Sequence, residues 1–100
     1  MIVIYINEYT VKTGQRDALI KELNESGAQD IFRSQPGCIC FNFSAPVNEP
    51  DKFYLTDAWA DEESFQAHTK CAGIPLWHAL KDKYFVGESV NRAYNAEVRN

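Results

Sequence analysis

The chain has 100 residues and a net charge of −4, with 45% apolar and 13% aromatic residues and with both signs of charge interspersed. This length predicts one domain over residues 1–100, and the scattered charge excludes the basic stripe that binding to nucleic acid or anionic lipid requires. The apolar residues 1–6 lack the basic leader of a signal peptide, and no stretch approaches the ~20 apolar residues of a membrane span. We therefore expect a cytoplasmic protein.

The first half of the chain predicts a strand, a helix and a second strand. Residues 2–11 alternate and are rich in β-branched and aromatic types, which is typical of a strand. Residues 15–34 predict one helix, which Pro36 and Gly37 end. Residues 38–45 then predict the second strand.

The second half predicts a strand, two helices and a last strand. Residues 52–60 predict the third strand, and Asp61 is a natural N-cap for a helix over 61–71 that Gly73 would end. A short helix over 75–83 and a final strand over 85–98 follow. The order β-α-β-β-α-(α)-β is the ferredoxin-like split βαβ arrangement, an α+β fold with an antiparallel sheet.

Both faces of the first predicted strand are apolar. Val3 and Tyr5 lie on one face, whereas Ile2, Ile4 and Ile6 lie on the other. Strands that are apolar on both faces need cover on both, but the helices of this topology cover only one. The remaining face would exceed the apolar patch that a soluble monomer tolerates, so we infer a homodimer whose sheets pack against each other.

One histidine is expected to face the interior. Phe65 and His68 fall on one stripe of the helix over 61–71, so a titratable ring points toward an aromatic interior. His68 is either a histidine at the edge of the core, bonded to a carbonyl, or a general base that takes a phenolic proton. Such a ring is how a small domain would line a pocket for an aromatic ligand.

Several other polar or amphipathic residues are candidates for ligand binding. Asn7 lies mid-strand among apolar neighbours, where a buried amide needs a partner, and Asn42 is a weaker case of the same kind. Trp59 either packs in the core or stacks on a planar ligand. Tyr5 and Tyr54 are possible wall residues with polar tips.

The sequence lacks the motifs of several other site types. Cys38 and Cys40 are expected on one face of a strand as reduced thiols, since an odd total of three cysteines argues against a disulfide framework. No Gly-rich phosphate loop, nucleophile elbow or metal-spaced His and Glu cluster is present. We expect no metal and no cofactor.

The chain resembles the antibiotic biosynthesis monooxygenase family, especially its small quinol-monooxygenase-like members, over nearly its whole length. The resemblance rests on Gly14, on Pro36-Gly37-Cys38, on Phe53-x-Leu55-x-Asp57-x-Trp59, and on Asp61, Phe65 and His68. One departure is Asp57, which stands where many members carry Glu.

This resemblance implies a dimeric α+β barrel that oxidises a small quinol or polyphenol with O2, without metal or flavin. It implies that His68 is the base or the orienting group, that Asn7 hydrogen-bonds the developing oxyanion, and that Trp59 supports the cavity wall. Phe65 would line the same site. The alternatives are a non-catalytic binder, a haem-degrading relative that would use His78, and an isomerase of the same fold.

Overall fold

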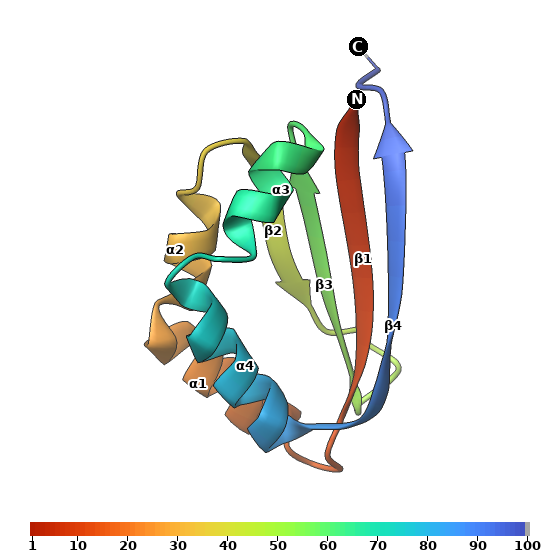
Figure 1. Cartoon of the computed structure of the whole chain (residues 1–100). Coiled ribbons are helices and arrows are strands. Elements are labelled where there is room, and N and C mark those ends of the chain that lie inside the picture. Colours follow the sequence, from red (N-terminus) through yellow and green to blue (C-terminus); the bar gives the residue numbers. More distant parts are fainter. Residues whose placement is uncertain (100) are drawn as a thin grey trace.

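The computed structural model describes residues 1–99 and confirms the predicted ferredoxin-like α+β fold. Its elements are β1 (Ile2–Val11), α1 (Arg16–Ser26), α2 (Ala28–Arg33), β2 (Cys38–Ser44), β3 (Lys52–Trp59), α3 (Glu62–His68), α4 (Gly73–Tyr84) and β4 (Phe85–Ala96). The strands form one antiparallel sheet in the order β2-β3-β1-β4, and the helices cover one of its faces (Figure 1). Within residues 1–99, no helix is both long and apolar enough to cross a membrane.

The helix predicted over residues 15–34 is in fact two helices. Gly27 has φ +75°, a left-handed conformation that ends α1, and α2 starts at the next residue. The Ser26 hydroxyl donates to the Leu23 carbonyl at 2.7 Å and accepts from the Ala28 N–H at 3.2 Å, so it satisfies backbone groups at the break. The change of direction buries Ala28 and Phe32 in the core.

The helix predicted over residues 61–71 begins as expected and ends early. Asp61 is the N-cap of α3, and its carboxylate accepts from the Ser64 N–H at 2.8 Å. Gly73 does not end this helix but begins α4. Its small size has a packing reason, because a Cβ at Gly73 would lie 2.6 Å from Cε1 of Phe32.

A bulge in β2 overturns the expectation that Cys38 and Cys40 share one face. Cys38 pairs with Trp59 and Cys40 pairs with Ala58, so Ile39 is an extra residue between two consecutive ladder positions. Cys38 therefore packs against the core on the helix side, whereas Cys40 faces the other way. Ile39 is left 54% exposed.

The two faces of the sheet have different surroundings. On the helix side, buried side chains of β1, β2 and β3 pack against the helices, with Trp59, Phe41 and Phe53 at the centre. On the outer side, Val90 and Tyr94 of β4 are 44% and 47% exposed beside the half-buried isoleucines of β1. The two-sided apolar pattern of the strands is thus present, and a single chain leaves the outer side uncovered.

Candidate functional site

A cavity of about 220 Å³ lies between the inner face of β1 and β3 and the helices α3 and α4. Its lining includes Tyr5, Asn7, Asp57, Phe65, His68 and Trp77. Figure 1 shows α3 and α4 facing this part of the sheet. The volume is below the ~300–1,000 Å³ of pockets for drug-sized molecules, so it suits a small ligand.

The sheet register brings polar groups of β1 and β3 together on the cavity side. Tyr5 lies directly opposite Asp57, and Asn7 lies opposite Leu55, one diagonal step away from Asp57. Side chains at such diagonal positions lie within ~7–8 Å of each other. The Asn7 amide makes no side-chain hydrogen bond within residues 1–99, so it is free for a ligand.

His68 lies at the end of α3 and is 7% exposed. Its ring stacks on Trp59 with centroids 4.7 Å apart and lies 5.3 Å from the ring of Phe41. Nδ1 is 2.9 Å from Oε1 of Gln35. With the Gln35 oxygen as acceptor, Nδ1 carries the proton and Nε2 keeps the lone pair. Burial lowers the pKa of His68 to about 4, so the ring is neutral at pH 7.

His68 also lines a second hollow of about 230 Å³, on the side of Gln35 and Pro36. Acidic side chains at the start of α3, those of Asp61 and Glu63, contribute to its wall. The imidazole therefore stands between two hollows, one bounded by apolar rings and one by carboxylates.

Asp57 is the most unusual group of the cavity. It is 2% exposed, and Trp59 Nε1 donates to its Oδ2 at 2.7 Å. Oδ1 is the only fully buried polar side-chain atom within residues 1–99 that has no hydrogen-bond partner. Burial raises the pKa of this carboxyl to about 6, against the opposing effect of the Trp59 hydrogen bond. Asp57 was not among the predicted site residues, although a lone acid on the apolar strand face of Phe53, Leu55 and Trp59 was a usable signal.

The aromatic wall of the cavity comes from two elements. The rings of Tyr5 and Phe65 stack with centroids 4.0 Å apart and planes at 19°. The Tyr5 hydroxyl lies 3.5 Å from Oε2 of Glu62, at the long limit of a hydrogen bond. Tyr5 and Phe65, both predicted as ligand contacts, thus line the cavity. Trp59 is fully buried and does not line the cavity, so of its two predicted roles the structure has core packing and not contact with a ligand.

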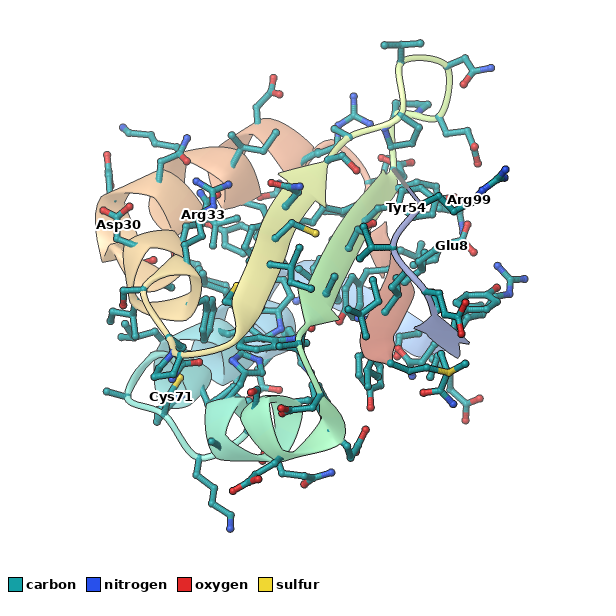
Figure 2. The ribbon with its side chains drawn as sticks, turned by 90° about the horizontal axis from the view of Figure 1, so that it is seen from above. Glu8, Asp30, Arg33, Tyr54, Cys71 and Arg99 are labelled. Carbon is teal, nitrogen blue, oxygen red and sulfur yellow. The ribbon has the colours of Figure 1, made fainter. Side chains whose placement is uncertain are left out.

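Two predicted ligand residues lie on the wrong face of the sheet. Asn42 pairs with Thr56 on the outer face and is exposed, and Tyr54 lies on that face too. The Tyr54 hydroxyl donates to Oε1 of Glu8 at 2.9 Å, and Figure 2 shows these two side chains next to each other. Asn42 and Tyr54, predicted as substrate contacts, therefore lie outside this cavity.

Residues 1–99 hold no cluster of metal ligands, and the candidate haem ligand His78 lies at the edge of the cavity. Among residues 1–99, no three His, Cys, Asp or Glu side chains gather closely enough to hold a metal ion. His78 is exposed on α4 and lines the edge of the cavity beside Lys81.

Comparison with known proteins gives the following likenesses. The family model for antibiotic biosynthesis monooxygenases matches residues 2–79. A putative antibiotic biosynthesis monooxygenase from Nitrosomonas europaea has a TM-score of 0.84 at 18% identity, over 95% of this chain and 89% of that one. SnoaB, a cofactor-independent oxygenase from Streptomyces nogalater, has a TM-score of 0.78 at 15% identity, over 98% and 95%. Rv0793 from Mycobacterium tuberculosis has a TM-score of 0.82 at 12% identity, over 99% and 98%. No curated protein matches.

Proposed function

Since the chain belongs to the antibiotic biosynthesis monooxygenase family, we propose that it oxidises a small quinol or polyphenol with O2 without a metal or flavin. The observation that carries this proposal is that Asn7 and His68 line one small cavity whose wall is aromatic. The likeness to SnoaB, described as a cofactor-independent oxygenase, supports the same reaction class.

The chemistry requires little from the protein beyond binding, deprotonation and exclusion of water. An anionic, electron-rich ring can pass an electron to O2 directly. Overall, one hydroquinone and one O2 give one hydroxyquinone and one water. One oxygen atom of O2 enters the ring and the other leaves as water. The ring supplies all four electrons that reduce O2. Exclusion of water by the bound ring would strengthen each hydrogen bond to the anionic ring.

In this proposal His68 orients the ligand and Asn7 stabilises negative charge. The neutral ring of His68, fixed by Gln35, offers Nε2 as an acceptor, and its pKa of about 4 favours the orienting role over that of a base. The Asn7 N–H groups would donate to the oxygen on which charge develops, the kind of contact that contributes ~10²–10³ in rate. Trp59 holds the His68 ring in place by stacking.

The test is oxygen uptake with a reduced naphthoquinone in chelator-treated buffer. Asn7→Ala is expected to lower kcat about 10²-fold or more. Asn42→Ala removes the same group from the outer face, and this matched control is expected to keep the wild-type rate. An unchanged rate in both Asn7→Ala and His68→Ala would exclude the assigned site.

We also propose that the outer sheet face is covered by a second copy of the chain. The support is the apolar character of that face, where Val90 and Tyr94 are nearly half exposed beside Ile2, Ile4 and Ile6. Pairing of two such faces would remove apolar surface that a monomer exposes to water.

A second candidate function is binding of haem or an aromatic metabolite without turnover. The observation that favours it is the exposed imidazole of His78 at the edge of the cavity. A haem titration that gives a Soret shift in the wild type and none in His78→Ala would support this function over the first.

A further inference from the structure

A buried carboxylate oxygen without a partner needs an explanation. Asp57 is 2% exposed, and its Oδ1 has neither solvent contact nor a hydrogen bond within residues 1–99. An unsatisfied buried polar atom costs ~1–3 kcal/mol, and more when it is charged. Such an atom in a residue that lines a cavity is an acceptor that a ligand can satisfy.

Only one of the two carboxylate oxygens of Asp57 has a partner in the protein. Oδ2 is held by Trp59 Nε1, and Trp59 lies outside the cavity lining. Asp57 is one of the residues that line the cavity, and Oδ1 is the carboxylate oxygen that Trp59 leaves unpaired. Across the ladder lies the ring of Tyr5, and one diagonal step away lies the unbonded amide of Asn7. An acceptor and a donor thus lie at diagonal positions of the ladder, next to the aromatic ring of Tyr5.

We propose that Asp57 Oδ1 accepts a hydrogen bond from a hydroxyl group of the aromatic ligand and takes up its proton, so that the cavity selects rings with a free hydroxyl. The O–H bond of the ligand breaks, the proton passes to Oδ1, and the electron pair stays on the ligand oxygen. The Asn7 N–H groups then donate to that oxygen. The proton-transfer step rests on the proposed function, whereas the recognition step does not.

Asp57 is better suited to this step than His68. Both groups line the cavity, but the pKa of about 6 for Asp57 exceeds the value of about 4 for His68, so the carboxylate is the stronger base. His68 already uses Nδ1–H for Gln35. The titratable groups facing Asp57 are Tyr5 and Tyr9 on β1, Cys38 on β2, His68 on α3, and His78 and Lys81 on α4.

The first experiment tests recognition alone. Anaerobic calorimetry compares hydroquinone with 1,4-dimethoxybenzene, which has the same ring but no hydroxyl donor. The wild type is expected to bind hydroquinone at least tenfold more tightly, and Asp57→Asn is expected to lose this preference because its amide N–H cannot accept a hydrogen bond. Equal binding of the two ligands by the wild type would overturn the proposal, and this comparison needs no variant.

The second experiment tests proton uptake through the pH profile of oxygen consumption. With the uncatalysed rate subtracted, the wild-type rate is expected to rise with pH through about 6, where Asp57 loses its proton. Asp57→Asn is expected to lose this rise together with at least 10²-fold in kcat. Asp30→Asn makes the same substitution at an exposed position of α2 outside the cavity, and this matched control should keep the rise.

The outcomes separate the two proposals. Hydroxyl-dependent binding that Asp57→Asn abolishes, without oxygen uptake by the wild type, would support Asp57 as the acceptor and exclude the monooxygenase. Oxygen uptake with an unchanged pH profile and unchanged ligand preference in Asp57→Asn would exclude the role of Asp57 and leave the monooxygenase in place.

Discussion

Replacement of Asp57 by Asn should change the pH dependence of stability in a defined direction. The pKa of this carboxyl is about 6 in the folded protein against 3.8 for an exposed aspartate. A shift of that size corresponds to about 3 kcal/mol, at ~1.36 kcal/mol per unit. Above pH 6 the buried carboxylate of the folded protein is charged, and this charge lowers the free energy of unfolding by that amount. As the pH falls from 6 to 3.8, Asp57 becomes protonated in the folded state before it does so in the unfolded state. The free energy of unfolding therefore rises again over this range.

The D57N variant retains the shape of the side chain and an oxygen for Trp59 Nε1, but it leaves a buried N–H group near the former Oδ1. That group costs ~1–3 kcal/mol at every pH. The informative quantity is therefore the free energy of unfolding of D57N minus that of the wild type, compared between pH 7 and pH 4. We expect this difference to be larger at pH 7 by about 2 kcal/mol, somewhat below the full ~3 kcal/mol because the unfolded carboxyl is itself partly protonated at pH 4.

Urea unfolding at several pH values between 4 and 7 measures this quantity. The lowered pKa of His68 gives stability the opposite pH dependence. The neutral buried ring contributes fully to the free energy of unfolding above pH 6.5, and this contribution is lost as the pH falls toward 4. Because His68 is present in both proteins, its contribution cancels in the comparison. A difference between the two proteins that stays constant from pH 4 to pH 7 would refute the assignment of a buried, weakly acidic Asp57.

Three further predictions concern other parts of the molecule. Gln35→Glu places a carboxylate against His68 Nδ1–H and should raise the pKa of that ring by a unit or more above about 4, measured by NMR titration; an unchanged value would contradict the hydrogen bond. Gly73→Ala should cost ~1–3 kcal/mol of stability because its Cβ meets Phe32, and a double variant with Phe32→Leu should regain part of it; full wild-type stability of the single variant would contradict the close contact. Wild-type chain should sediment as a dimer at micromolar concentration and Ile4→Glu as a monomer; a monomeric wild type would exclude paired sheets.

The architecture was predictable because alternation of apolar residues marks each strand and Asp61 marks the start of α3. The two errors in helix boundaries both involve glycine. Gly27 lies inside a helical pattern, and nothing local distinguishes a tolerated helical glycine from one with positive φ. Gly73 owes its place to contact with Phe32, a residue 41 positions earlier, which no local pattern can reveal.

The site was predictable only in part. Asn7 and His68 stood out as polar residues on apolar stripes, and both line the cavity. Asn42 and Tyr54 were selected for residue type, although strand alternation already put them opposite their inward-facing neighbours. Asp57 was missed as a ligand group although the sequence shows a lone acid on an apolar strand face; only its unpartnered oxygen is a property of the folded surroundings, which composition and spacing do not contain.

The extra residue in β2 has a consequence for how the strand tolerates changes in length. Six of its seven residues occupy rungs of the ladder with β3, and Ile39 occupies none. Deletion of Ile39 would leave Cys38, Cys40 and Phe41 in regular alternation, with the first and third side chains directed inward as they are now. Removal of any residue between 41 and 43 would instead shift the alternation, so that the side chains on one side of the deletion would point to the opposite face of the sheet. Length variation in this strand should therefore concentrate at position 39.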